Sequence, residues 1–153
     1  MNDAVNPQPI FSMDKIYVKD ISLEVPHAPQ IFLERESPQI DVQLHSQATA
    51  IEAGVYEVAV TTTVTARLAD KVMFLIEAKQ AGIFQVRNVP NEELEPILAV
   101  MCPNILFPYL REVVSDVSVR GGFAPVMLNP VNFEVLYQQQ RQQLEQVTSA
   151  TTH

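Results

Sequence analysis

Several features that mark common classes of protein are missing from this sequence. Its 153 residues include a single cysteine, Cys102, so an internal disulfide is excluded and a reducing compartment is favoured. The first residues have neither the basic nor the apolar segment of a secretory signal. The longest apolar runs, such as residues 72–76, fall far short of the ~20 residues that span a bilayer. We therefore expect a cytoplasmic protein without direct membrane insertion.

Positive charge is also scarce. Ten Lys and Arg residues stand against eighteen Asp and Glu, which gives a formal net charge of −8, and the basic residues are scattered along the chain. Nucleic-acid binding relies on clustered Lys and Arg, so no nucleic-acid partner is expected. An acidic surface is suited either to solubility alone or to a basic polypeptide partner.

Groups that carry chemistry are few. The histidines His27, His45 and His153 have no metal-ligand spacing to each other or to Cys102, and no glycine-rich nucleotide-binding motif is present. Asp41 and His45 share one face of a predicted strand but lie two steps apart on it, which is more typical of a solvated polar face than of a catalytic dyad. We expect no metal, no cofactor and no enzyme activity.

The first half of the chain does contain clear strand patterns. Apolar and polar residues alternate in three segments separated by two short turns. The alternating segments are 40–50, 56–68 and 72–79, and the turns are 52–54 and 69–71. A further strand, roughly residues 15–25, changes phase, and a bulge near Lys19-Asp20 would keep its apolar residues on the core side. These patterns predict antiparallel strands.

Helix signals dominate the second half. Asn91 is expected to cap one helix and Asn104 the next, and Arg120-Gly121-Gly122 is expected to end it. The apolar stripe of that second helix is Leu106, Phe107, Leu110, Val113, Val114 and Val117. A last helix begins near residues 129–132, and its buried face uses Phe133, Leu136 and Tyr137. Strands followed by helices predict an α+β fold with the helices packed on one sheet face.

Two connections are unusually apolar. Residues 26–38 hold three prolines and are expected to be extended, and residues 123–130 are likewise bounded by proline. We predict that the two form a groove for extended chains, in which methionine adapts to varied partners; closure over the core is the alternative. The groove residues are Ile31, Phe32, Leu33, Phe123, Val126, Met127 and Leu128.

Several motifs resemble those of SecB, the bacterial protein-export chaperone family. The similarity runs over roughly residues 11–140 in one order, and the helix block 102–112 is the most specific part. The matching segments are Cys102-Pro-Asn-Ile-Leu-Phe-Pro-Tyr-Leu-Arg-Glu112, Arg120-Gly-Gly-Phe123, Asn129-Pro-Val-Asn-Phe133 and Leu136-Tyr137, with strand segments 16–24, 55–58 and 82–84. One position departs from the family: members often have tryptophan in the loop after the first strand, where this chain has Glu36.

The resemblance implies a four-stranded antiparallel sheet with helices, assembled as a homotetramer that is a dimer of dimers. It implies a chaperone that uses no ATP, keeps unfolded secretory precursor proteins competent for translocation, and delivers them to the SecA translocation ATPase. The expected organisation is a flexible N-terminus (1–10), one domain (11–140) and a flexible tail (141–153).

The resemblance also implies where SecA docks, through its basic, zinc-bearing tail. The expected docking residues are Asp20, Glu24, Leu75 and Glu77. Asp20 and Glu24 point to the same side of the first strand, and Leu75 and Glu77 point to the same side of the last strand. Three carboxylates would therefore flank an exposed leucine if both strands show the same sheet face. A solvated sheet face is the alternative.

The remaining predictions concern assembly and competing functions. Phe74, Ile76 and Ala78 form one apolar strand face, which we expect to lie near the contacts between dimers; a purely intramolecular core role is the alternative. Besides the export chaperone, the sequence leaves open a purely structural assembly protein, a SecB-like chaperone dedicated to one client such as an antitoxin, and, last, an enzyme.

Overall fold

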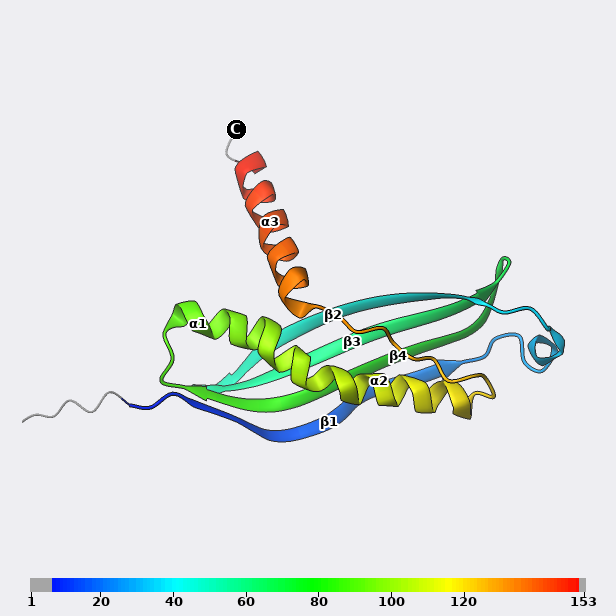
Figure 1. The fold of residues 1–153 in the computed structure, drawn as a ribbon, viewed down its shortest axis with the longest axis horizontal. Helices are drawn as coiled ribbons and strands as arrows, with labels where there is room; N and C mark the ends of the chain where they lie inside the picture. Colours follow the sequence, from blue (N-terminus) through cyan, green and yellow to red (C-terminus); the bar gives the residue numbers. More distant parts are fainter. Residues whose placement is uncertain (1–6, 152–153) are drawn as a thin grey trace, which may run out of the picture.

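Four antiparallel strands form one sheet in the order β1-β4-β3-β2 in the computed structural model, which describes residues 7–151 (Figure 1). The strands are β1 (Ile10–Glu24), β2 (Gln39–Glu52), β3 (Val55–Leu68) and β4 (Lys71–Arg87). Strands β1 and β2 are therefore the two edges. The helices are η1 (Gln30–Leu33), α1 (Asn91–Pro96), η2 (Ile97–Met101), α2 (Cys102–Arg120) and α3 (Phe133–Thr151). The predicted α+β fold with a four-stranded antiparallel sheet is confirmed.

The two predicted hairpin turns occur where the sequence places them. The β2–β3 turn uses Gly54 at a φ of 76°, a left-handed conformation that glycine adopts without steric cost. The β3–β4 turn uses Ala69 and Asp70, with Ala69 at a φ of 54°. These short turns fix the register of two pairings, β2 with β3 and β3 with β4, and that register decides which side chains share a face.

The predicted bulge in β1 is present. The pairing register of β1 on β4 shifts between Val18 and Asp20. Ile16 before the shift and Ile21 and Leu23 after it all lie on the face that the helices cover. An extra residue in one strand has this effect, because it moves the residues that follow it to the opposite face, so that apolar positions of different phase all point to the core.

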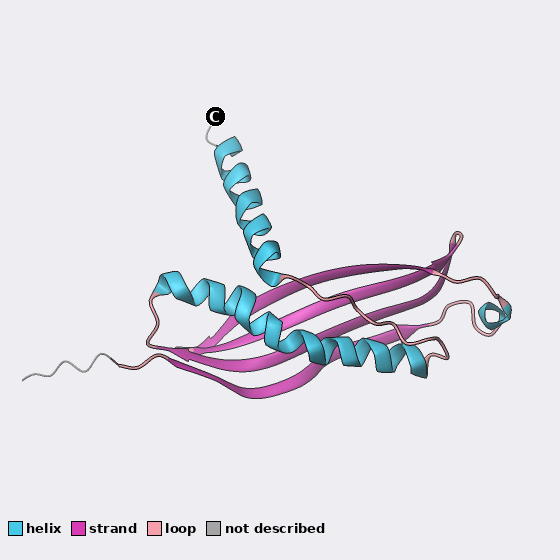
Figure 2. Cartoon of the chain, viewed as in Figure 1, coloured by secondary structure: helices cyan, strands magenta, loops and turns pink. Residues whose placement is uncertain are grey.

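Helices cover only one face of the sheet, and the hydrophobic core lies between them (Figure 2). Alternate residues of β3 and β4 point into this layer, and α2 lies across them with the predicted apolar stripe on its inner side. The stripe residues that the structure buries are Leu106, Phe107, Leu110, Val114 and Val117. The other sheet face carries the polar side chains of the strands, and no helix of residues 7–151 lies on it.

The helix starts differ from the prediction. Asn91 is the first residue of α1 rather than its cap, and Pro90 precedes it. Asn104 lies inside α2, because α1, a π-helical segment η2 and α2 follow one another from Asn91 to Arg120 without a break that would need a second cap. Proline inside a helix removes one backbone hydrogen bond, and Pro103 follows within two residues of the π-helical segment η2, where the regular hydrogen-bond pattern is already interrupted.

The stretch 91–120 is long and apolar enough to cross a membrane by length and composition alone. Its inner side, however, packs on the sheet, and Leu106, Leu110 and Val114 are fully buried there. The core helix of a globular domain has the same composition for this reason.

The connection 26–38 was predicted to be extended, but part of it is helical. Residues Gln30–Leu33 form one turn of 3₁₀ helix, in which the amide of Phe32 donates to the carbonyl of Pro29 at 3.1 Å. Prolines before this turn are compatible with it, because 3₁₀ turns are short and proline fits their first positions. The turn drives Ile31 into the core.

Helix α3 begins at the predicted place and projects away from the sheet (Figure 1). The side-chain oxygen of Asn132 accepts a hydrogen bond from the amide of Val135 at 3.1 Å, which is an N-cap. Residues 141–151 continue this helix, and the flexibility expected for 141–153 stays a prediction. Of the expected flexible N-terminus, residues 1–6 lie outside the described residues, whereas Ile10 already begins β1.

Candidate functional site

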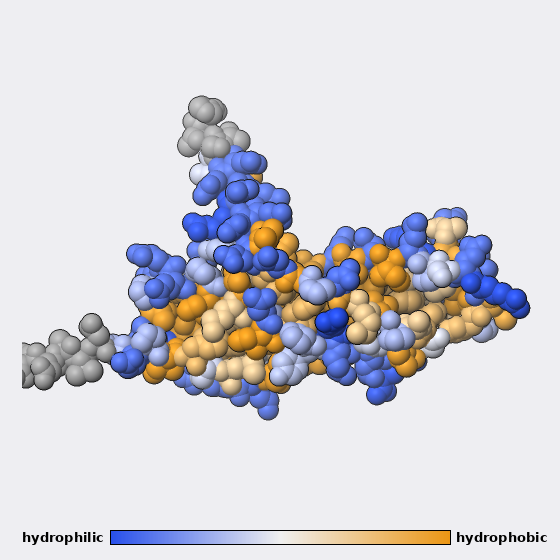
Figure 3. Space-filling model, viewed as in Figure 1, coloured by the Kyte–Doolittle hydropathy of each residue, from blue (hydrophilic) through white to orange (hydrophobic). Residues whose placement is uncertain are grey.

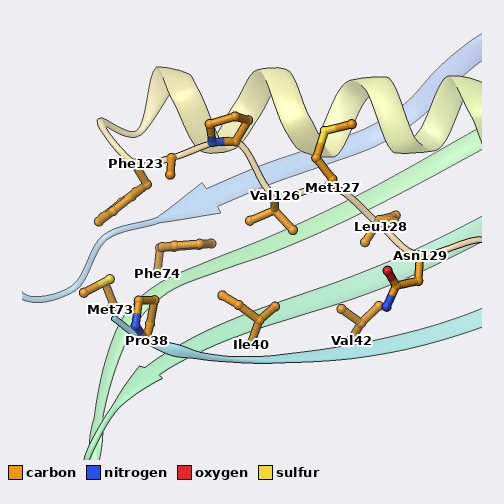
Figure 4. A pocket seen from close by; sticks show the side chains of 12 residues that line it. Pro38, Ile40, Val42, Met73, Phe74, Phe123, Val126, Met127, Leu128 and Asn129 are labelled. Atoms are coloured by element: carbon orange, nitrogen blue, oxygen red, sulfur yellow. The ribbon is translucent and has the colours of Figure 1, made fainter. Parts of the chain in front are cut away.

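A groove of about 460 Å³ runs between the edge strand β2 and the connector that joins α2 to α3, residues 121–132 (Figure 4). Side chains from β2 and from the connector point toward one another across it. We call it the connector groove, and its lining residues are Pro38, Ile40, Val42, Met73, Phe74, Phe123, Ala124, Pro125, Val126, Met127, Leu128 and Asn129. Nearly all are apolar, so the groove is suited to apolar side chains rather than to a polar small molecule.

The connector is held in place by the end of α2. Gly122 has a φ of 88°, which turns the chain back after the helix. The buried hydroxyl of Ser118 accepts a hydrogen bond from the amide of Val126 at 2.9 Å and donates to the carbonyl of Ser115 at 2.8 Å. The groove wall is therefore fixed by hydrogen bonds of the Ser118 hydroxyl to the backbone, which leaves the exposed apolar side chains of the wall free to contact a ligand.

A row of three aromatic rings closes one end of the connector groove. The ring of Phe123 lies 4.5 Å from that of Phe74 and stacks on Phe32 at 5.2 Å, measured between centroids. Aromatic pairs at such distances stabilise their arrangement beyond the area they bury. Phe32 is still 49% exposed, so the row presents an aromatic surface at the groove end.

The structure brings together most of the predicted groove residues, but not all. Phe123, Val126, Met127 and Leu128 line the connector groove, and Phe32 joins it through the stacked rings. Ile31 is not available to a ligand because it is only 3% exposed within the core. Leu33 is 82% exposed and lies outside the lining of the groove.

Sequence reasoning missed the opposite wall. Ile40 and Val42 were identified as an apolar strand face, yet they remain 43% and 45% exposed because β2 is an edge strand. Met73 faces the groove because the β3–β4 register shifts beside it, between Ala66 and Arg67. The alternation was visible in the sequence, but only the strand order shows that no further strand or helix covers it.

The groove continues along β2 in a second hollow of about 340 Å³. Val42, Leu128 and Asn129 line both hollows, and Leu44 and Leu136 extend the apolar lining toward α3. Figure 3 shows apolar side chains gathered on the same face of the body, whereas α3 is mostly hydrophilic. A chain segment several residues long would therefore meet apolar surface along much of β2.

The four residues predicted to dock SecA come together on the bare sheet face. Glu24 lies opposite Leu75, Ser22 opposite Glu77, and Asp20 opposite Lys79 in the pairing of β1 with β4. Directly paired residues of antiparallel strands point to the same side. We call Asp20, Glu24, Leu75 and Glu77 the open-face patch. Within residues 7–151 none of its carboxylates forms a salt bridge, so their charge is available to a partner.

A second cluster lies beyond the patch on the same face. Glu57 of β3 reaches over β4 to β1, where it accepts hydrogen bonds from the hydroxyl of Tyr17 and from the Lys19 ammonium at 2.7 Å. These two bonds, that from Lys19 first, lower the pKa of Glu57. Burial, and next the bond to Glu57, raise the pKa of Tyr17 to about 12. This cluster ties β1 to β3 and neutralises its own charges, unlike the open-face patch.

The residues predicted at the oligomer interface lie in the core of the single chain. Phe74, Ile76 and Ala78 are at most 2% exposed, because α2 covers the strand face that they form. Their side chains pack within one chain, so their predicted place near the contacts between dimers stays a prediction. Exposed apolar residues on the β1 edge are better placed, among them Val18 and Ile21, each 45% exposed.

No group of three or more His, Cys, Asp and Glu side chains suited to a metal occurs among residues 7–151. Cys102 is fully buried, and this burial raises the pKa of its thiol to about 12. A thiol with so high a pKa is a poor nucleophile. Cys102 is therefore a core residue rather than a candidate nucleophile.

Comparison with known sequences gives one consistent answer. The family model described as "Preprotein translocase subunit SecB" matches residues 4–144. A protein-export protein SecB of Methylobacillus flagellatus is 58% identical over 150 residues, which cover 98% of this chain and 96% of that protein. A protein of the same name from Nitrosomonas eutropha is 64% identical over 138 residues, covering 89% of this chain and 86% of the other.

Comparison with solved structures supports the fold. A SecB-like chaperone of Mycobacterium tuberculosis, solved in complex with a peptide from an antitoxin, superposes with a TM-score of 0.66. The alignment covers 79% of this chain and 90% of the other at 20% sequence identity. At that identity the likeness concerns the arrangement of sheet and helices alone.

Proposed function

The chain belongs to the SecB family of protein-export chaperones, and we propose that it holds unfolded precursor proteins in the connector groove and passes them to SecA. The observation that carries the groove assignment is its lining, because the twelve residues, from β2, β4, the connector and Pro38 before β2, are almost all apolar. Ile40, Val42 and Met127 among them are left 43%, 45% and 59% exposed. Burial of apolar surface is non-directional, so such a groove binds unfolded segments without reading a particular sequence.

The size of the groove fits this role. Each 100 Å² of apolar surface that a client buries contributes about 2.5 kcal/mol before the entropy of ordering is subtracted. The two hollows along β2 take several side chains of one extended segment, and the aromatic row from Phe32 to Phe74 gives a place for a large one. No nucleotide is needed for this binding, because it is driven by burial alone.

We assign SecA docking to the open-face patch. The pairing register sets Glu24 and Glu77 around Leu75 on a face without helices, which matches a basic peptide that carries an apolar anchor. Acidic groups of this kind raise the rate of encounter with a basic partner. The chain's net charge of −8 acts in the same direction.

For assembly we propose a homotetramer whose first contact is the β1 edge. Unpaired strand edges associate readily, and this edge carries the exposed apolar side chains Val18 and Ile21. The edge is bulged next to them, between Val18 and Asp20, and bulges are common at sheet edges. Outward-facing Met101 and Tyr109, 45% and 47% exposed along η2 and α2, are candidates for the contact between dimers.

The function is tested by mixing the protein with a slowly refolding secretory precursor and following the aggregation of that client by light scattering. We expect suppression of aggregation at near-stoichiometric amounts, with no change on addition of ATP. Val126→Ser should reduce the suppression, because it places a hydroxyl in the apolar lining. Ile51→Ser is the matched control, since Ile51 is 55% exposed at the far end of β2, outside the groove.

Client range is tested with several unrelated precursors in the same assay. A general export chaperone suppresses the aggregation of most of them. A protein that protects one client and ignores the others is instead a dedicated chaperone, and a protein that protects none has a purely structural role.

A further inference from the structure

Met127 occupies an unusual position on the connector. It lines the connector groove on one side, and on the other it lines a separate hollow of about 650 Å³ on the outer surface of α2. That second hollow holds Arg111, Ser115 and Asp116 in its wall beside the apolar Pro108 and Val119. We call it the α2 hollow. Met127 therefore separates the connector groove from a hollow whose wall contains charged and hydroxyl side chains.

The sulfur of Met127 is both accessible and hydrogen-bonded. The side chain is 59% exposed, against 45% for Met101, 38% for Met13 and 6% for Met73. The hydroxyl of Ser115 lies 3.7 Å from its Sδ and donates to it from the side of the α2 hollow. Susceptibility of methionine to oxidation increases with exposure, so Met127 is the most reactive of these four by accessibility alone.

From these observations we propose that Met127 is an oxidation site through which peroxides weaken client binding. This inference rests on the connector groove being the client site. In the reaction, a sulfur lone pair attacks one oxygen of hydrogen peroxide, so an S–O bond forms and the O–O bond breaks. The sulfur is oxidised by two electrons, and the leaving oxygen takes the remaining proton to become water. The products are methionine sulfoxide and water.

Ser115 favours addition of the oxygen on the α2 side of the sulfur. A hydroxyl that already donates to the sulfur is within reach of the oxygen that becomes bound to it, and it stabilises that oxygen as charge develops there. The sulfoxide oxygen is a strong acceptor, and the Ser115 hydroxyl on the α2 side is the donor that already contacts the sulfur. The groove lining beside Met127 is mostly apolar, with Val126 and Leu128 next to it and Asn129 as its one amide side chain. The oxidised side chain therefore stays on the side of the α2 hollow, bonded to Ser115.

Oxidation of Met127 then makes one part of the connector-groove wall polar. Thioether methionine supplies flexible apolar contact, and its sulfoxide is polar. A client bound beside the sulfoxide would either lose that contact or cover a polar group without a partner. We expect client affinity to fall about three- to tenfold, the effect of one apolar contact. Methionine sulfoxide reductase should restore it, since this oxidation is reversible.

The experiment has a chemical arm and a binding arm. In the first, the full-length protein is treated with graded hydrogen peroxide and the oxidation of each methionine is followed by peptide mass spectrometry. Met127 should react faster than Met101 by about two- to tenfold, the rate equivalent of one hydrogen bond. Ser115→Ala should bring the two rates together. Equal rates in the wild-type protein would overturn the proposal.

In the binding arm, the affinity for a fluorescent unfolded precursor is measured before and after peroxide. Met127→Leu is the decisive variant, because it keeps an apolar side chain that peroxide does not oxidise. The wild-type protein should lose affinity and Met127→Leu should not. Equal loss in both, or loss in neither, would overturn the switch. Val126→Ser separates the two ideas: if it too leaves client affinity unchanged, the groove itself is not the client site.

Discussion

Glu24 of β1 lies directly opposite Leu75 of β4, on the sheet face that no helix covers. The pair joins a carboxylate and an apolar side chain that have no reason to attract one another. Because their strands are adjacent, both are presented together to the outside. The neighbouring pair of Ser22 and Glu77 adds a second carboxylate one step along. The arrangement is a charged rim around an apolar anchor point.

Reversal of the three carboxylates in the open-face patch should abolish SecA docking. We expect Asp20→Lys, Glu24→Lys and Glu77→Lys together to reduce the affinity for SecA at low salt and to reduce its salt dependence, because exposed charges act mainly through screened attraction. The measurement is a titration of SecA at low and high salt.

The matched control for this variant reverses Glu36, Glu52 and Glu92, which are equally exposed but lie elsewhere. It makes the same change in net charge. If the control loses SecA as fully as the patch variant, the effect is one of overall charge. Loss of client holding along with docking would mean that the fold was damaged.

Polar substitution at the groove should weaken client binding while leaving the fold cooperative. Phe32→Ser combined with Met127→Gln removes two side chains that are 49% and 59% exposed, so little core packing is lost with them. We expect client affinity to fall about tenfold or more, measured by fluorescence anisotropy of a labelled precursor. Unchanged affinity with an unchanged unfolding transition would exclude the connector groove as the client site.

The two sheet edges should respond differently to charge. Val18→Lys with Ile21→Lys places two charges on the β1 edge and should lower the mass of the protein in solution, because inserted lysines block strand association. Val42→Lys, a residue with the same 45% exposure on the β2 edge, should leave the mass unchanged and reduce client binding. Light scattering at micromolar concentration measures both. A wild-type protein of monomer mass would end the assembly proposal.

Ile76 should contribute to the fold rather than to assembly. It is fully buried between β4 and α2, so Ile76→Ala should lower the free energy of unfolding by about 2–5 kcal/mol. Chemical denaturation at a fixed protein concentration measures this. The mass of the folded variant should equal that of the wild type; a shift to a smaller species while the domain stays folded would restore the interface role.

The Tyr17–Glu57–Lys19 cluster should make stability depend on pH at both extremes. The folded pKa of Glu57 is lowered, so its contribution is present above its ordinary value of 4.5 and is lost as pH falls through the folded value. The folded pKa of Tyr17 is raised to about 12, so its contribution is present below 10.0 and is lost as pH rises toward 12. Glu57→Gln should lose less stability than wild type between pH 6 and pH 3, by under about 1 kcal/mol for a partly exposed pair. Parallel pH profiles of denaturation midpoints would contradict this.

Local patterns predicted the secondary structure well where one strong signal acted alone. Strict alternation in β3, the phase change in β1 and the paired glycines after Arg120 each have a single physical explanation, and all three occur. The helix starts were wrong because asparagine is a good cap in isolation, whereas the chain here runs through Asn104 without interruption. Pro103 near that point lies inside the continuing helix, just after the π-helical segment η2, where the regular hydrogen-bond pattern is already interrupted.

The candidate sites depend on which strands are neighbours in the sheet, and the residue pattern within a single strand does not contain that information. The strand order β1-β4-β3-β2 makes β2 an edge and leaves Ile40 and Val42 uncovered. The same order puts β1 beside β4 and thereby brings Glu24 to Leu75. β1 and β4 are far apart in the sequence, so no local pattern shows that they pair. The alternation of each strand shows only which residues would share a face if the two strands were neighbours. Phe74, Ile76 and Ala78 were assigned to assembly because alternation identifies an apolar face without saying what covers it.

The sheet is one layer thick, with the proposed client groove on its helix-covered face and the open-face patch on the other. Occupation of one face leaves the other sterically open, so SecA docked on the open-face patch and a client in the connector groove would not overlap within a subunit. Docking of SecA would then not displace the client by occupying the same surface. Transfer of the client would instead depend on binding sites for unfolded chains on SecA itself. Docking raises the effective concentration of those sites beside the held client, and the client moves to whichever site retains it longer.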